Sequence, residues 1–170
     1  MLIFFDLEAT CWKNNRARQS AESEIIEIGA IKEDGQTFRS FVRPVINPVL
    51  TGFCTELTGI TQADVDGADD FGVAGRKFMW FCGQGKLVSW GAYDSRQLRK
   101  DCGRHKIKWQ FDHLNLKNEY SKLMGVTTDL LKATRHAELE FAGAHHRALD
   151  DAKAVFNIYR YVLKNKMRKD

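Results

Sequence analysis

The distribution of apolar and polar positions predicts an α/β protein whose strands come first. Three short apolar segments rich in Ile, Phe and Val occupy the first quarter of the chain and are separated by polar residues. Segments of this length between polar or turn-forming residues are typical of strands. We expect strands over 2–8, 25–32 and 37–42. The turn residues 33–36 predict an antiparallel hairpin between the last two, and the polar residues 13–23 predict a loop or hairpin tip.

Beyond this hairpin the pattern changes to helices that alternate with short strands. Pro44 and Pro48 indicate an extended connection, because proline fixes its own φ angle and disfavours helix at the preceding residue. The residues at 61–64 resemble the capped start of a helix. Apolar residues at helical spacing predict further helices over 69–82, 95–102 and 148–162, with a short buried strand at 86–90 and an extended segment at 107–111. We therefore expect a sheet of mixed direction with helices on both faces.

Length and composition narrow the class of protein. The 170 residues predict one compact domain over 1–170, and 44% hydrophobic with 28% charged residues exclude disordered and collagen-like chains. The first apolar run is short, has no basic segment before it and leads into acids, so neither a signal peptide nor a membrane span is predicted. The four cysteines form no Cys-x-x-Cys pair, which argues against a zinc site and indicates reduced thiols in a cytoplasmic protein.

The charge distribution permits a polyanionic partner without requiring one. The net charge is +4. One basic run contains Arg96, Arg99, Lys100, Arg104, Lys106 and Lys108. This basic run is a candidate phosphate-contacting surface, although a solvated helix face gives the same pattern. We interpret the basic residues at 164–169 as a frayed terminus.

Two acids directly behind the first apolar run require an explanation. Residues two apart in a strand share one face, so Asp6 and Glu8 would point the same way and repel each other. One interpretation is that the strand ends at Phe5 and both acids lie in solvent, which is ordinary. The other is that they bind a divalent cation, because carboxylate oxygens suit magnesium or manganese. Acids elsewhere in the chain decide between the two.

Two further segments bring acids to the ends of predicted elements. Asp94 follows a buried-looking strand and a glycine, where a helix N-cap would give the same pattern. Asp150 and Asp151 begin the final helix after His145 and His146, where acids also complement the helix dipole. Acids from three separate segments, one with a histidine, are what two-metal hydrolysis of a phosphodiester requires, with the cations about 3.5–4 Å apart.

Three motifs carry a family resemblance. "DLEATC", "SWGAYD" and "HHRALDDAKA" resemble the exonuclease motifs of the DnaQ-like superfamily, in its DEDDh branch, whose fold is similar to that of ribonuclease H. The stretch "FVRPVINPVLTGFCTELTGITQADV" is similar to that of the Eri-type RNA 3′ exonucleases. The resemblance extends from Ile3 to about Tyr159. It implies a ribonuclease H-like α/β fold, in which three antiparallel strands precede alternating helices and parallel strands.

The resemblance implies a set of metal ligands and a general base. The metal ligands would be Asp6, Glu8, Asp94 and Asp151, with Asp6 bridging two Mg²⁺ or Mn²⁺ ions. His146 would be the base, because the family places its histidine five residues before the acid in a His-x-Ala-x-x-Asp pattern. A histidine of near-neutral pKa can take a proton from the attacking water. The Gly143-Ala144 approach would let this histidine move in with substrate.

A second histidine pairing stays open. His145 and Asp150 have the same spacing as the assigned pair, but Ala148 then falls outside the pattern. We therefore favour His146 with Asp151.

The resemblance also implies contacts to the 3′ end of a nucleic acid. The backbone around Ala9 and Thr10 would meet the 3′ ribose. Phe53 and Leu57 would flank the terminal base, since an aromatic or apolar wall stacks bases without reading sequence. Trp12 and Trp90 are further candidates, although a tryptophan beside a strand is more often core.

These inferences predict a metal-dependent 3′-to-5′ exonuclease that releases nucleoside 5′-monophosphates. Its partners would be nucleic-acid 3′ ends in single strands or overhangs, with RNA favoured over DNA, and no membrane partner is expected. The protein would be a cytoplasmic monomer or homodimer. Some animal Eri-type proteins carry a nucleic-acid-binding domain before the nuclease, and this chain is expected to be the catalytic module alone. The alternatives are a non-catalytic nucleic-acid-binding protein, a protein-docking regulator on the same fold, and a nuclease that cuts internally.

Overall fold

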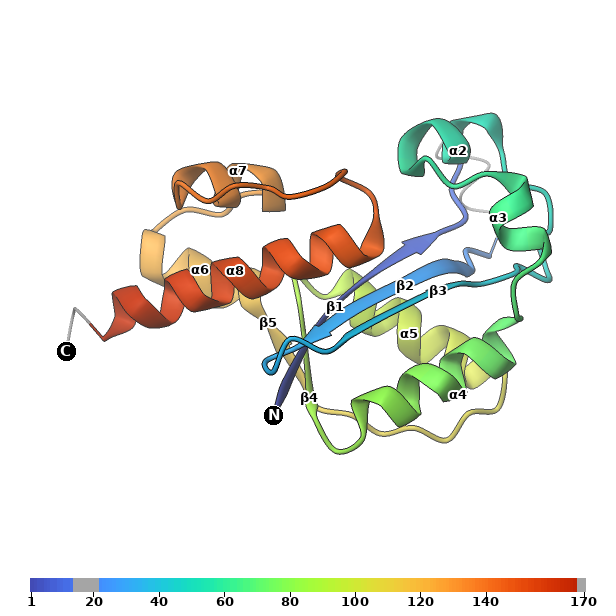
Figure 1. The fold of residues 1–170 in the computed structure, drawn as a ribbon, viewed down its shortest axis with the longest axis horizontal. Coiled ribbons are helices and arrows are strands. Elements are labelled where there is room, and N and C mark those ends of the chain that lie inside the picture. The colour runs from blue at the N-terminus through green and yellow to red at the C-terminus, as the bar shows by residue number, and fades with distance from the viewer. Residues whose placement is uncertain (14–21, 168–170) are drawn as a thin grey trace.

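Strands from the two halves of the chain form one five-stranded sheet in the order β3-β2-β1-β4-β5 (Figure 1). The computed structural model describes residues 1–13 and 22–167. The strands are β1 (Leu2–Ala9), β2 (Ile25–Lys32), β3 (Thr37–Phe41), β4 (Lys86–Ser89) and β5 (His113–Asn115). β1, β2 and β3 pair antiparallel, whereas β4 is parallel to β1 and β5 is parallel to β4. This arrangement confirms the predicted mixed sheet.

Helices cover both faces of the sheet (Figure 1). They are α2 (Gly52–Thr58), α3 (Gln62–Asp66), α4 (Phe71–Cys82), α5 (Tyr93–Arg104), α6 (Leu116–Met124), α7 (Leu130–His136) and α8 (Ala148–Lys166). Residues of α4 and α5 pack on one face, and residues of α6, α7 and α8 pack on the other. None of these helices in the described part of the chain is long and apolar enough to cross a membrane.

Successive side chains of β1 point to opposite faces of the sheet. Phe5 belongs to the core beneath α4 and α5, whereas Phe4 belongs to the core beneath α8. Asp6 and Glu8 are in phase with Phe4, so both acids lie on the α8 face of the sheet. The apolar half of β1 thus anchors the strand, and its acidic half meets the N-terminal end of α8.

Most predicted elements agree with the structure. The turn at 33–36 is present, with Gly35 at a φ angle of 88°, and Thr61 begins α3 with a capping box to Asp64. Most of the predicted loop at 13–23 lies outside the described residues. None of the four cysteines forms a disulfide.

The structure differs from the sequence predictions at three places, and one prediction, the frayed basic tail, was wrong. The segment predicted as extended, 107–111, lies outside the sheet: Ile107, Trp109 and Phe111 pack against the core, and β5 begins two residues later. The short helix α2 was missed; Thr51 caps its start and Gly59, at a φ angle of 68°, ends it. The basic tail is helical through Lys166, whose ammonium lies 2.7 Å from Glu119.

Candidate active site

Local chain geometry brings Asp94 to the acidic end of β1. After β4 the chain turns at Gly91, whose φ angle of 111° favours glycine, and enters α5. The N-cap of α5 is Ala92, so the interpretation of Asp94 as a capping residue was wrong. Asp94 instead lies within the first turn and is only 5% exposed. Burial raises its pKa to about 7, although hydrogen bonds from backbone N–H groups and the Ser89 hydroxyl oppose the shift.

The N-terminal end of α8 supplies the remaining acid. Asp151 is 2% exposed and accepts two hydrogen bonds from the residues before the helix. The Nδ1 atom of His145 lies 2.8 Å from Oδ1 of Asp151, and the backbone N–H of His146 donates to Oδ2 at 2.8 Å. His146 has a φ angle of 65°, which is uncommon for a residue with a side chain. The carboxylate of Asp151 thus holds this loop in place.

The acids from the three segments meet in one cavity of about 400 Å³. Carboxylate oxygens of Asp6, Glu8 and Asp151 lie within 4.8 Å of one another, and Asp94 lines the same cavity. Desolvation, followed by the charges of Asp94 and Asp151, raises the pKa of Asp6 well above its usual range. Desolvation and Asp151 likewise raise the pKa of Glu8 to about 9. A cluster of hard oxygen donors with this much mutual repulsion fits divalent cations.

Both histidines line this cavity. Their rings stack with centroids 3.9 Å apart, and Nδ1 of His146 lies 4.0 Å from Oε1 of Glu8, beyond hydrogen-bonding distance. Burial and then the neighbouring His145 lower the pKa of His146, which favours its neutral form. His145 contacts Asp151 rather than Asp150.

Asp150 is not part of the cluster of acids and has other partners. It accepts a hydrogen bond from the backbone N–H of Ala144 at 3.1 Å and lies 3.6 Å from the ammonium of Lys153. The structure therefore provides no His145–Asp150 contact of the kind that the alternative spacing would need. The same hydrogen bond fastens the Gly143-Ala144 approach to α8.

A second cavity of about 570 Å³ adjoins the first. Thr10, Trp12, Phe53 and Leu57 line it, while Ala9 and Leu57 line the carboxylate cavity. The two cavities share Cys11, Leu57 and Tyr93. All five predicted substrate-contacting residues therefore lie at or beside the acids.

Two of the candidate substrate-binding residues also make contacts within the protein. The Thr10 hydroxyl accepts a hydrogen bond from the backbone N–H of Glu24 at 3.0 Å. Trp90 lines the carboxylate cavity and packs edge-on against Tyr120, with ring centroids 5.5 Å apart.

Sequence reasoning missed other residues that line the carboxylate cavity. Lys117, from the first turn of α6, is the only lysine or arginine among the described residues that line it. Tyr93 lies between the two cavities and is 41% exposed. Tyr93 sits inside the "SWGAYD" motif and could have been found there, whereas no signal around Lys117 pointed to the site.

The basic run on and after α5 does not form one uniform surface. Arg104 pairs with Asp101 and lies 2.5 Å from Glu22, and the guanidinium of Arg99 lies 4.1 Å from the centroid of the Phe111 ring. Lys100 lines the second cavity. The run thus brings one lysine to the candidate site, while Arg99 and Arg104 make intramolecular contacts.

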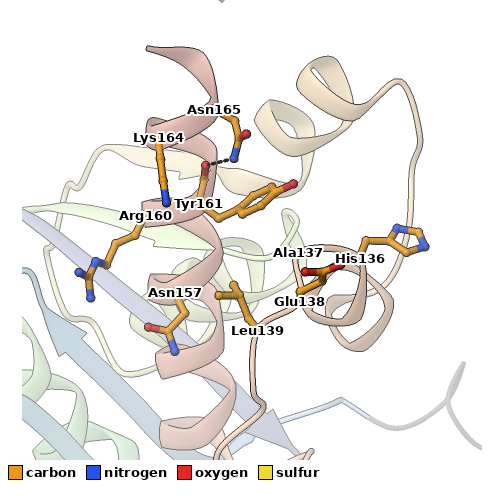
Figure 2. A pocket seen from close by; sticks show the side chains of 9 residues that line it. All are labelled: His136, Ala137, Glu138, Leu139, Asn157, Arg160, Tyr161, Lys164 and Asn165. Atoms are coloured by element: carbon orange, nitrogen blue, oxygen red, sulfur yellow. Dashed lines mark hydrogen bonds between the residues drawn. The ribbon is translucent and has the colours of Figure 1, made fainter. Parts of the chain in front are cut away.

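A larger cavity of about 820 Å³ lies between α8 and the segment 136–139 (Figure 2). Figure 2 shows Arg160, Tyr161 and Lys164 of α8 on one side of it and the segment 136–139 on the other. None of the clustered carboxylates lines it, so its size does not make it the candidate active site.

Comparisons with known proteins agree with this geometry. The model of the exonuclease family RNase_T matches residues 3–159. The chain is 35% identical to ERI1 exoribonuclease 3 of Homo sapiens, covering 93% of this chain and 52% of that protein. It is 31% identical to the probable 3′-5′ exonuclease KapD of Bacillus subtilis (strain 168), covering 97% of this chain and 85% of that protein. The chain thus spans about half the length of the ERI1 relative.

Solved structures of exonucleases are also similar to this chain. The nuclease domain of 3′hExo, a DEDDh family member bound to rAMP, is 29% identical, with a TM-score of 0.88 over 96% of this chain and 92% of that one. A 3′-exonuclease described in 3′-end specific recognition of a histone mRNA stem-loop is 27% identical, with a TM-score of 0.85 over 96% of this chain and 63% of that one. The chain therefore belongs to the exonuclease family, as a DEDDh-type member with a ribonuclease H-like fold.

Proposed function

We propose that this chain is a metal-dependent 3′-to-5′ exonuclease. It hydrolyses the terminal phosphodiester of single-stranded RNA or of a 3′ overhang and releases nucleoside 5′-monophosphates. The observation that carries the proposal is the set of carboxylate oxygens from Asp6, Glu8 and Asp151 within 4.8 Å of one another, with Asp94 in the same cavity. A purely structural cluster of buried acids would need cationic partners. Among the described residues no lysine or arginine forms an ion pair with these four acids, and their partners are His145 and His146, which are charged only when protonated.

The proposed metal ligands are Asp6, Glu8, Asp94 and Asp151. Members of this family normally use divalent metal ions, and we propose that these four residues would hold two Mg²⁺ or Mn²⁺ ions, with Asp6 as the central ligand. Asp6 suits that position because both Asp94 and Asp151 act on its pKa. The bound cations would supply Lewis-acid activation of water and stabilise the charge on the leaving oxygen.

The proposed general base is His146. Its neutral form is favoured by its surroundings, and its ring lines the cavity beside Glu8. A base in this position takes the proton of the water that attacks the terminal phosphorus in line with the leaving 3′ oxygen. His145 has a different role in this scheme: its contact with Oδ1 fixes the orientation of Asp151.

The two adjoining cavities suggest the path of the strand. We place the 3′-terminal nucleotide where the two cavities meet, with its ribose against Ala9 and Thr10 and its base between Phe53 and Leu57. The preceding nucleotide would lie further along the second cavity, beside Trp12. Aromatic walls stack any base, which suits an enzyme that removes successive nucleotides. Lys117 lines the same cavity as the acids and would contact a phosphate oxygen.

RNA is the favoured substrate, because one relative named above is described as an exoribonuclease and one solved structure as recognising an mRNA 3′ end. DNA is the second candidate substrate. We also retain a single domain over 1–170, a monomer or homodimer, and a cytoplasmic location as predictions.

The test is a time course on 5′-labelled RNA and DNA oligonucleotides of equal length with Mg²⁺ or Mn²⁺, comparing wild type with Asp6→Asn. The expected result is a ladder that shortens from the 3′ end by one nucleotide at a time and is lost with chelator and in the variant. Internal fragments would instead indicate an endonuclease. A folded, metal-binding wild type that cleaves neither substrate would leave the non-catalytic binding or docking function.

A further inference from the structure

Strand β2 carries a fully buried acid that the proposed metal site does not use. Glu27 is 0% exposed and stands opposite Glu8 in the antiparallel register of β1 and β2. Directly opposed residues project from the same face of a sheet, so Glu27 lies on the α8 face beside the metal-ligand cluster. A buried carboxylate next to other carboxylates needs donors of its own.

Donors surround both oxygens of Glu27. Oε1 accepts a hydrogen bond from Nε of Arg39 at 2.7 Å and lies 3.4 Å from a terminal nitrogen of Arg147. Oε2 accepts from the backbone N–H of Ala148 at 3.2 Å and from Nε of Arg147 at 3.4 Å. With two arginines and one amide on its oxygens, Glu27 serves as an anchor rather than as a metal ligand.

The anchored amide is the first of α8. Ala148 begins the helix, and the N-cap residue Arg147 provides no side-chain cap. The first N–H groups of a helix have no partner within the helix. Glu27, from β2, therefore supplies the side-chain cap that the N-cap residue does not provide. Gly29 permits this approach, because a Cβ atom there would overlap the backbone of Ala148 and Leu149.

The amide that Glu27 binds belongs to Ala148, which lies between the proposed base and a proposed metal ligand in the sequence. His146 stands two residues before Ala148, and Asp151 stands three residues after it. A shift of the helix start would therefore move the proposed base and a proposed metal ligand together. The guanidiniums of Arg39 and Arg147 also lie 5.0 and 5.5 Å from the centroid of the Phe41 ring, which limits how far they can turn.

We propose that Glu27 is a positioning residue of the active site: its carboxylate caps α8 and restrains Arg147, and it thereby sets the positions of Asp151 and His146. This inference rests on the proposed exonuclease function. Loss of the Glu27 charge also removes the ion pair that restrains Arg147, the residue directly before the first turn of α8.

The test compares Glu27→Gln with Asp101→Asn as a matched control. Asp101 is also buried, at 1% exposed, pairs with an arginine, and fastens its helix to the start of β2 through the N–H of Ile25. Its hydrogen bonds and ion pair among the described residues are with Ile25, Gln97 and Arg104, none of which belongs to α8. Mn²⁺ is titrated into each metal-free protein and the melting temperature is followed, and kcat and KM are then measured on a single-stranded RNA.

We expect Glu27→Gln to need about 10- to 100-fold more Mn²⁺ for half of the wild-type melting-temperature shift, with a similar fall in kcat and a KM changed by less than about threefold. Asp101→Asn should lower the melting temperature and keep the wild-type Mn²⁺ dependence. A Glu27→Gln protein with wild-type Mn²⁺ dependence and kcat would overturn the proposal, as would an equal loss of Mn²⁺ binding in both variants.

Two other outcomes of the experiment still test the proposal. If Glu27→Gln does not fold, Arg39→Met removes a partially exposed half of the anchor, at 44% side-chain exposure, and the same outcomes apply. If the wild type binds Mn²⁺ but cleaves no oligonucleotide, the proposed function fails, while the Mn²⁺ titration still decides the role of Glu27.

Discussion

The side chain of His145 and the backbone N–H of His146 each meet a different oxygen of the Asp151 carboxylate, both at 2.8 Å. Two adjacent histidines are thus tied to one acid in different ways. The ring of His145 is engaged with the carboxylate, whereas the ring of His146 faces the cavity beside Glu8. This difference predicts that the two side chains contribute differently to catalysis.

We expect His146→Ala to lower kcat about 100- to 10,000-fold with little change in metal requirement, because a general base contributes about this factor. His145→Ala should act through Asp151, with a loss of about 10- to 100-fold and a raised metal requirement. Single-turnover rates at several Mg²⁺ concentrations separate the two effects. The opposite pattern, with the larger metal-independent loss in His145→Ala, would assign the base to His145.

The acid cluster should make the metal-free protein less stable as pH rises. The pKa of Asp94 is about 7 and that of Glu8 is about 9, both above the values of about 4 in unfolded chains. The folded state therefore keeps protons that the unfolded state has lost. Their contribution to stability is fully present below about pH 4 and is lost as pH rises through the folded-state values of about 7 and 9.

With chelator present, the melting temperature should therefore fall between pH 6 and pH 9, and added Mg²⁺ should raise it more at pH 9 than at pH 6. Asp6→Asn should flatten this pH dependence and abolish the Mg²⁺ effect, because it removes one charge from the centre of the cluster. Asp150→Asn, which alters an acid outside the cluster, is the control. A metal-free melting temperature that rises over this pH range would contradict the prediction.

Lys117 should contribute to substrate binding through a phosphate. We expect Lys117→Met to weaken binding of RNA about 10-fold at low salt and to reduce the salt dependence of binding by roughly one phosphate contact. Lys122→Met, on the same helix but 74% exposed and paired with Glu119, should change neither quantity. Fluorescence anisotropy with a labelled oligonucleotide and Ca²⁺ in place of Mg²⁺ measures both, and equal behaviour of the two variants would remove Lys117 from the site.

How far the sequence predicts this molecule depends on the range of each interaction. The alternation of Phe4, Phe5, Asp6 and Glu8 is a local property of a strand, so it predicts that both acids share a face. The motif resemblance adds Asp94 and Asp151 to the same predicted site. In the structure all four acids line one cavity.

Features that depend on distant partners were not predictable in this way. Glu27 lies in "IIEIGA", which is recognisable as a strand, but its partners Arg147 and Ala148 are 120 and 121 residues away. Lys117 reaches the cavity only because β5 pairs beside β4, and β5 has three residues and no strong pattern. The segment 107–111, just before β5, is the more apolar of the two, so the apolar pattern does not single out β5.

Gly29 offers a direct test of how closely α8 must approach the sheet. In Gly29→Ala the new Cβ would overlap backbone atoms of Ala148 and Leu149, which cannot rotate aside as a side chain can. The helix start must move instead, and such a backbone shift costs about 1–3 kcal/mol of unfolding free energy. Gly103→Ala, within α5 with open space around its Cβ position, should be neutral or stabilising by up to about 1 kcal/mol. Urea denaturation measures both changes. Because the shift moves Asp151, Gly29→Ala should also raise the Mn²⁺ requirement, whereas a loss of stability with unchanged metal binding would show that the helix start can move without carrying the ligand.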